Sequence, residues 1–216
     1  MTSIKYFFQF LIILILFAIF RILGLKFASN FSGLLLKIFG PFFRSKKLIK
    51  QNILRAFPNI RDKDLKKINK NMWNNYGRIL SEYVFMKNFR ETRFKNNLEI
   101  VGQNILEEIK KENKPVIFVS GHFNNFELMA MHIEKSGVDL AVVYRPLNNK
   151  FLNFIMEKIR RTYICKNQIK KGLAGTRQLL TYFKNKHSIA LMIDQRVSQG
   201  IKSNFFKQEA YTTKIP

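Results

Sequence analysis

The first quarter of the chain carries the longest apolar run. Residues 6–25 contain a single charged side chain, Arg21, and match the roughly 20 residues that a helix needs to cross a bilayer core. Arg21 lies near one end of the run, where its guanidinium can reach the lipid headgroups. A second apolar stretch, residues 31–43, is broken by Gly40-Pro41 and is too short to span. The pattern predicts a membrane-anchoring helix and then an amphipathic helix at the membrane surface, together forming an anchor over residues 1–43.

The basic residues around this anchor predict its orientation. One lysine precedes the apolar run, whereas six basic residues follow it within residues 26–50. By the positive-inside rule the remainder of the chain lies in the cytoplasm, against the inner leaflet. A cleaved signal peptide is disfavoured, because residues 27–30 (Phe-Ala-Ser-Asn) make a poor cleavage site and the positive charge beyond them hinders export. A buried or interfacial helix is the other alternative.

Beyond the anchor, the pattern predicts one α/β domain over residues 44–216. Apolar side chains at helical spacing over residues 63–87 predict a long amphipathic helix. Short apolar runs then alternate with helical stretches, an order typical of a mostly parallel central sheet flanked by helices. The predicted strands are 98–101, 116–120, 140–144 and 188–193, and the predicted helices are 104–112, 126–135, 150–160 and 173–184.

Charge and cysteine content narrow the classes of partner. The formal net charge of +24 favours an anionic partner such as lipid, nucleic acid or an acidic protein, although a biased genome composition would also produce it. No zinc-finger or RNA-binding pattern is present, which disfavours nucleic acid. Cys165 is the only cysteine, so the chain has no disulfide of its own, and the three histidines show no metal-ligand spacing. We therefore expect no metal.

His122 and Glu127 are the most informative candidates for chemistry. Gly121 permits a sharp turn after the strand 116–120, so His122 should emerge at the carboxyl end of a strand, where open α/β sheets bind their ligands. In one continuous helix, side chains five residues apart point roughly 140° away from each other. A helix that begins between them, with Asn124 or Asn125 as N-cap, would let the Glu127 carboxylate reach the imidazole. Alternatively, residues 124–127 form only a capping box and His122 is a turn residue.

These residues resemble a known family. Residues 120–129 (Ser-Gly-His-Phe-Asn-Asn-Phe-Glu-Leu-Met) look like the H-x4-D/E signature of glycerolipid-type acyltransferases, and are most similar to the lauroyl/myristoyl acyltransferases of lipid A biosynthesis. Asn124 and Lys207 stand where that family usually has glycine. Because the family's relatives continue beyond the block that contains Pro216, we expect the chain to be truncated. Further blocks resemble the family in its order: residues 52–58, 75–78 with 82, 143–148, 194–195 and 205–212.

The resemblance implies transfer of a fatty acyl chain from acyl carrier protein to a hydroxyl of a phosphorylated glucosamine lipid, the lipid A precursor. In this scheme His122 removes the hydroxyl proton and Glu127 orients its ring. Arg145 stabilises the oxyanion or holds a phosphate. The other residues implied in substrate binding are Asn125, Arg160, Asp194 and Gln195.

The resemblance also implies the protein's cofactors, partners and location. No cofactor is expected beyond acyl carrier protein as co-substrate, and no nucleic acid partner. The expected partners are the acidic carrier, the phosphorylated glycolipid acceptor and anionic inner-leaflet lipids, at the cytoplasmic face of a bacterial inner membrane. The alternatives are acyl transfer to another glycolipid or a lysophospholipid, and a non-catalytic basic protein bound to membranes.

Overall fold

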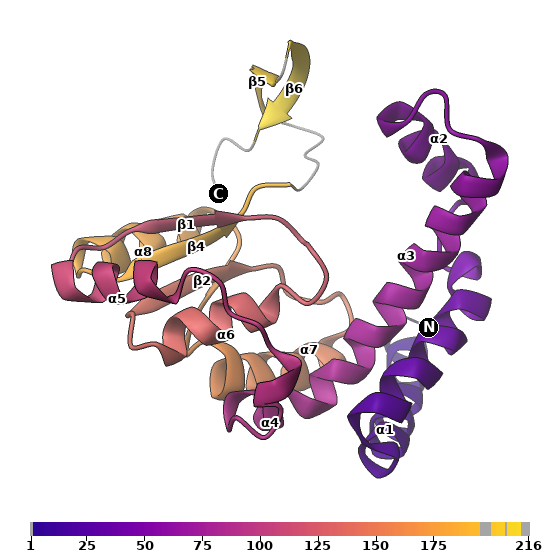
Figure 1. Cartoon of the computed structure of the whole chain (residues 1–216), viewed down its shortest axis with the longest axis horizontal. Helices are drawn as coiled ribbons and strands as arrows, with labels where there is room; N and C mark the ends of the chain where they lie inside the picture. Colours follow the sequence, from indigo (N-terminus) through magenta and orange to yellow (C-terminus); the bar gives the residue numbers. More distant parts are fainter. Residues whose placement is uncertain (1, 195–199, 206, 213–216) are drawn as a thin grey trace. The chain divides into compact units, whose positions relative to one another are not determined.

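The computed structural model describes residues 2–194, 200–205 and 207–212 (Figure 1). Its contacts divide the chain into two compact units, Met1–Met86 and Lys87–Pro216. The sequence predicted an anchor over residues 1–43 and a catalytic domain beyond it, and a helix beyond residue 43 packs along the anchor in the first unit. Each unit is described separately below.

The first unit is helical. The predicted apolar helix is present as α1 (Thr2–Phe39), and the stretch Ser3–Phe42 is long and apolar enough to cross a membrane. Gly24 is non-helical, with φ 74° and ψ 164°, so α1 consists of two helical segments. The second segment ends just before Gly40-Pro41, as the sequence predicts. The remaining elements are η1 (Gly40–Phe42), α2 (Lys46–Ala56), α3 (Asp62–Glu82) and η2 (Tyr83–Phe85).

Small residues allow α1 and α3 to approach closely. Gly77 of α3 lies against the backbone of Ser32 and Gly33, and a Cβ atom on Gly77 would overlap the Ser32 oxygen. The interface also contains polar contacts: the Arg78 guanidinium donates to Ser29 Oγ at 3.2 Å and to Asn74 Oδ1 at 2.8 Å. This packing makes α3, which corresponds to the long amphipathic helix predicted over residues 63–87, part of the first unit.

The second unit contains a four-stranded sheet in the order β1-β4-β2-β3, in which all neighbouring strands are parallel. A separate antiparallel pair, β5 (Ile201–Phe205) and β6 (Gln208–Thr212), follows. The predicted α/β class with a parallel sheet is therefore confirmed. In chain order, the elements are α4 (Met86–Arg90), η3 (Lys95–Asn97), α5 (Gln103–Glu112), β1 (Ile117–Ser120), α6 (Glu127–Lys135), β2 (Leu140–Tyr144), α7 (Lys150–Ile159), η4 (Arg160–Ile164), β3 (Asn167–Lys170), α8 (Leu173–Lys184) and β4 (Ser188–Met192).

One predicted strand is wrong. Residues 98–101 form no strand; Ile100 and Val101 are exposed, and the chain turns at Gly102 (φ 85°) into α5. The apolar run is short and finds no neighbouring strand to pair with. The sequence also missed β3, a mostly polar strand that pairs in parallel with β2.

Helices cover both faces of the sheet, with α8 on one side and α6 and α7 on the other (Figure 1). The core under α8 contains Ala141, Ile169, Leu179 and Ile189, all almost fully buried. Because the four strands are parallel, their carboxyl ends share one edge. The residues that follow the strands at this edge include His122 after β1, Asp194 after β4, Arg145 after β2 and Lys171 after β3.

Candidate active site at the carboxyl edge of the sheet

His122 and Asp194 meet because their strands are neighbours. Ser120 of β1 pairs with Met192 of β4, and each site residue lies two positions beyond. The Asp194 carboxylate spans two donors of one residue: Oδ1 lies 2.7 Å from His122 Nδ1, and Oδ2 accepts from the His122 backbone N–H at 2.7 Å. Gly121 leaves the necessary room, since a Cβ there would lie 3.1 Å from Asp194 Oδ2.

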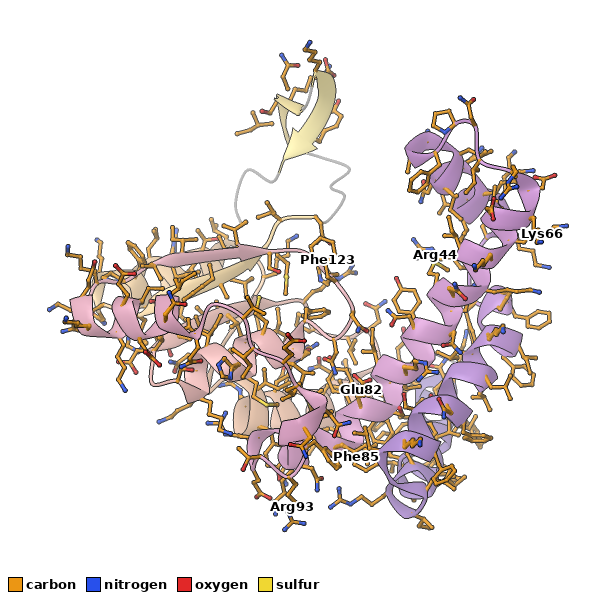
Figure 2. All side chains as sticks on the ribbon, viewed as in Figure 1. Arg44, Lys66, Glu82, Phe85, Arg93 and Phe123 are labelled. Atoms are coloured by element: carbon orange, nitrogen blue, oxygen red, sulfur yellow. The ribbon has the colours of Figure 1, made fainter. Side chains whose placement is uncertain are left out.

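The other side of the imidazole faces outward. The His122 side chain is 36% exposed, and within the described parts of the chain no hydrogen bond reaches its Nε2 atom. The ring of Phe126 packs edge-on against the imidazole at 4.8 Å. Phe123 lies on the same loop and is largely exposed (Figure 2). The site therefore presents a partly exposed imidazole that packs against the ring of Phe126.

Electrostatics keep the Asp194 carboxylate ionised. Partial burial acts to raise the pKa of Asp194, but the hydrogen bonds from the backbone N–H and ring of His122 outweigh it and lower the pKa. Asp194 is thus a charged acceptor at neutral pH. The sequence placed it in the site, but as a substrate-binding residue.

Glu127 lies against Arg160. Its Oε1 atom accepts from Arg160 Nε at 2.8 Å and lies 2.6 Å from Arg160 Nη2. The Arg160 guanidinium also lies 5.8 Å from the centre of the Tyr144 ring. The carboxylate that bonds His122 Nδ1 is that of Asp194, whereas Glu127 ties the start of α6 to η4.

The loop before α6 differs in part from the prediction. Glu127 is in the first turn, as predicted, but the N-cap is Phe126, without a side-chain hydrogen bond, and not Asn124 or Asn125. The Asn125 carbonyl instead accepts from the Leu128 N–H at 3.2 Å, which closes the turn into the helix. Asn124 adopts φ 46°, which agrees with the left-handed turn that a glycine usually supplies there.

A second polar network fixes the helix that follows β2. The Tyr144 hydroxyl donates to Glu157 Oε1, which also accepts from Asn153 Nδ2 at 2.9 Å. Burial, together with the hydrogen bond to Glu157, raises the pKa of Tyr144 to about 12. The Leu147 N–H donates to Asn153 Oδ1 at 2.8 Å. These contacts hold the loop from Tyr144 to Leu147, in which Arg145 is exposed.

Three further residues named in the sequence analysis are Asn125, Gln195 and Cys165. Asn125, in the loop before α6, is buried. Gln195 lies outside the described residues. Cys165 is fully buried, and burial raises the pKa of its thiol to about 12, so this thiol is a poor nucleophile.

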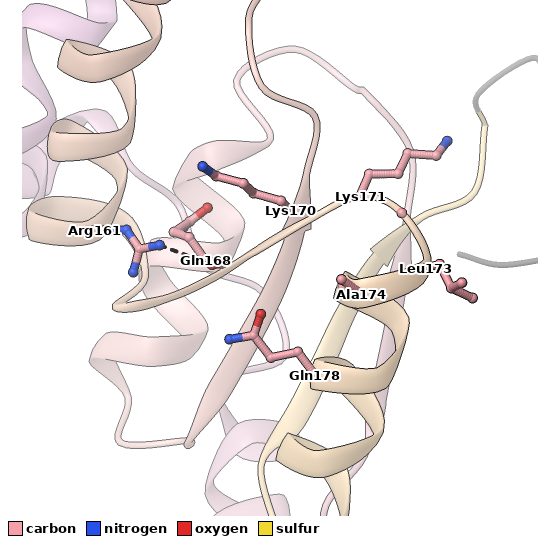
Figure 3. A pocket seen from close by; sticks show the side chains of 9 residues that line it. Arg161, Gln168, Lys170, Lys171, Leu173, Ala174 and Gln178 are labelled. Carbon is pink, nitrogen blue, oxygen red and sulfur yellow. Dashed lines mark hydrogen bonds between the residues drawn. The ribbon is translucent and has the colours of Figure 1, made fainter.

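A basic hollow lies at the carboxyl end of β3 (Figure 3). It measures about 450 Å³ and is lined by the cationic side chains of Arg161, Lys170 and Lys171, with Gln168, Gln178 and the first turn of α8. Because β1 and β3 are the outer strands of the sheet, this hollow is separate from His122. The sequence named Arg160, the neighbour of Arg161, as a substrate-binding residue, and it missed the lysines because it missed β3.

Comparison with known protein families identifies a family that the chain matches. Residues 1–216 match the model of a family described as bacterial lipid A biosynthesis acyltransferase. Comparison with curated proteins finds no match. The family match spans the whole chain, including His122, Asp194 and the Glu127–Arg160 pair.

Proposed function

Because the chain belongs to the bacterial lipid A biosynthesis acyltransferases, we propose that it moves a fatty acyl chain from acyl carrier protein to a hydroxyl of a lipid A precursor, with His122 as general base. The observation that carries this proposal is the orientation of His122. Its Nδ1 atom is engaged by Asp194, while Nε2 faces outward at the edge where parallel sheets bind ligands.

The proposed reaction needs one proton acceptor. The acceptor hydroxyl gives its proton to His122 Nε2 as its oxygen attacks the thioester carbonyl carbon of the acyl carrier protein. A C–O bond forms and the C–S bond breaks. The leaving thiolate takes the proton from the imidazolium, so that His122 returns to its neutral form. General base catalysis of this kind contributes about 10²–10⁴ in rate.

Arg145 is the proposed stabiliser of negative charge near His122. It follows β2, whose neighbour β4 leads to Asp194. Its side chain is exposed, and within the described residues it forms no ion pair. A guanidinium in this position can stabilise the thioester oxyanion or bind a phosphate through two parallel hydrogen bonds.

The positive charge of the chain supports anionic partners for the same reaction. Arg161, Lys170 and Lys171 line the basic hollow and suit a phosphate of the acceptor lipid. The net charge of +24 also suits an acidic carrier protein and an anionic leaflet. We place α1 in the bacterial inner membrane with the second unit in the cytoplasm, because six basic residues follow its apolar run and one precedes it.

The test is an acyl-transfer assay on membranes that contain the full-length protein. Labelled acyl carrier protein is incubated with a tetra-acylated lipid A precursor, and in parallel with a lysophospholipid, to identify the acceptor. His122→Gln should reduce transfer by about 10²–10⁴-fold. The matched control is His187→Gln, at a half-buried histidine that is hydrogen-bonded to the Asn185 carbonyl. A His122→Gln variant with the wild-type rate would exclude His122 as the base.

A further inference from the structure

We infer that the outer face of α7 lies against a lipid leaflet, so that the second unit has a membrane contact of its own besides the apolar helix of the first unit. This surface, which we call the α7 face, consists of Lys150, Phe151, Phe154 and Lys158. Its chemistry fits the headgroup region of a bilayer that contains anionic lipids. The contact is independent of catalysis, whereas its consequence for the acceptor lipid rests on the proposed function.

Helix α7 is apolar on almost every side, yet it buries none of its residues. Six of its ten residues are apolar, and each of them stays at least partly exposed. A helix of this composition is normally buried in a protein core or in lipid. By comparison, α8 buries Gly175 and Leu179 and covers the core of the sheet. The exposed apolar side of α7 therefore needs a partner that the described residues do not supply.

The exposed residues of α7 form one stripe. Positions 150, 151, 154 and 158 lie within roughly 100° of one another around a helix, so their side chains share one face. Phe154 is 72% exposed and lies about one helical turn from a lysine on either side. Phe151 is 39% exposed, and Leu147, just before the helix, is 42% exposed. Phenylalanines between lysines are typical of helices at the membrane interface, where the rings enter the acyl boundary and the lysine stems extend to the phosphates.

The charges on α7 suit an anionic surface. Lys150 and Lys158 are both exposed. The one acidic residue of the helix, Glu157, is engaged by the body of the unit, where it accepts from the Tyr144 hydroxyl and from Asn153 Nδ2. The α7 face itself therefore presents cations and aromatic rings, and the phosphate groups of an anionic leaflet attract such a surface.

The size of the α7 face favours a lipid surface over a protein partner. Stable protein interfaces bury about 1,200–2,000 Å² in total. The face has four side chains on a helix of 10 residues, about 15 Å long, and is too small for such an interface. A leaflet imposes no such minimum, because the stretch Ser3–Phe42 of the same chain is long and apolar enough to cross a membrane and keeps the second unit at a high effective concentration of lipid.

The contact holds the loop after β2 close to the leaflet. The Leu147 N–H donates to Asn153 Oδ1, so the loop that contains Arg145 is joined to α7. A phosphorylated lipid acceptor can then reach Arg145 while its acyl chains stay in the bilayer. Phe154→Asp places a charge in the middle of the face and should weaken docking by at least about tenfold, the equivalent of one phenylalanine leaving an apolar environment. We expect this variant to raise KM for the acceptor in membranes and to leave kcat unchanged.

The lipid contact can be measured without an activity assay. The full-length protein is placed in nanodiscs of phosphatidylethanolamine and phosphatidylglycerol, with an environment-sensitive fluorophore on Leu147→Cys, beside the α7 face. Cys165 is fully buried and the pKa of its thiol is raised to about 12, so the label reacts at the new cysteine. We expect a blue-shifted emission that is quenched by lipids with a nitroxide at the headgroup. The control is Leu180→Cys, at an exposed leucine of α8 on the opposite face of the sheet, whose label should stay unquenched (Figure 1).

Phe154→Asp should abolish the quenching of the Leu147→Cys label. Full quenching in Phe154→Asp, or equal quenching of the labels at Leu147→Cys and Leu180→Cys, would overturn the inference. A blue shift that lipid nitroxides do not quench, or that appears only when acyl carrier protein is added, would overturn it as well, because the α7 face would then bind protein. A protein that shows the lipid contact but transfers no acyl group would exclude the proposed function and support the contact.

Discussion

Glu127 and Arg160 form a nearly buried ion pair, with 2.6 Å between Glu127 Oε1 and Arg160 Nη2. Replacing Arg160 by leucine would leave the Glu127 carboxylate in place without its main counter-charge. Loss of one partner of a buried pair costs about 3–5 kcal/mol. We expect Arg160→Leu to lower the free energy of unfolding by about this amount, measured by urea denaturation of the purified protein in detergent.

A double-mutant cycle separates loss of the pair from loss of volume. Apolar replacement of both partners of a buried pair is often close to neutral. The combined Glu127→Leu and Arg160→Leu variant should therefore be more stable than Arg160→Leu alone. Additive effects of the two substitutions would show that the pair contributes nothing to stability.

His132 should make the stability of the second unit depend on pH. Burial, and next the charge of Lys135, lower the pKa of His132 below its ordinary value of 6.5. Its Nε2 atom lies 2.7 Å from Gln103 Oε1, which ties α6 to α5. Because the folded state binds the proton less tightly than the unfolded state, the contribution is complete above about pH 6.5 and is lost as the pH falls through the lowered value.

Thermal unfolding between pH 7.5 and pH 5 measures this effect. The wild type should show a melting temperature that falls with pH, and His132→Gln should show a smaller fall. His187→Gln removes a half-buried histidine that packs on Tyr182, and serves as the control. Parallel pH profiles for all three proteins would contradict the role of His132.

The predicted strands were located correctly where the local pattern was sufficient. The elements β1, β2 and β4 are runs of apolar side chains bounded by polar residues, a signal that the sequence carries by itself. β3 has one apolar residue, Ile169. Its first residue bonds a distant backbone group, with Asn167 Nδ2 donating to the Leu140 carbonyl at 3.0 Å. Such bonds exist only after the chain has folded.

The candidate site shows the same difference between features that a local sequence pattern predicts and contacts that depend on the folded sheet. A strand followed by glycine was enough to place His122 at the sheet edge, whereas Asp194 was named from the family resemblance, as a substrate-binding residue. Their hydrogen bond depends on the pairing of β1 with β4, which is a property of the sheet order and not of either segment. The sequence assigned Glu127 to His122 from the H-x4-E spacing and the family resemblance, and the structure shows Arg160, 33 positions away, bonded to Glu127.

Gly77 provides a test of the packing of α1 on α3. A methyl group at this position would overlap the backbone oxygen of Ser32 and force the helices apart. We expect Gly77→Ala to destabilise the first unit by about 1–3 kcal/mol, the usual cost of overpacking. The control is Asn71→Ala, on an exposed position of the same helix. Equal unfolding free energies for the two variants, measured in detergent, would contradict this close contact.

The basic hollow at β3 should contribute to binding of the acceptor lipid and not to the chemical step. Lys170→Gln and Arg161→Gln each remove a positive charge that lines it. A hydrogen bond to a charged group contributes about 1.5–3 kcal/mol, so we expect each variant to raise KM for a phosphorylated acceptor by about 10- to 100-fold, with kcat nearly unchanged. The same variants should leave KM unchanged for an acceptor from which the phosphate has been removed. Lys184→Gln, at the other end of α8, is the matched control for the loss of one charge. A similar rise in KM for Lys184→Gln would mean that overall charge, and not the hollow, attracts the acceptor.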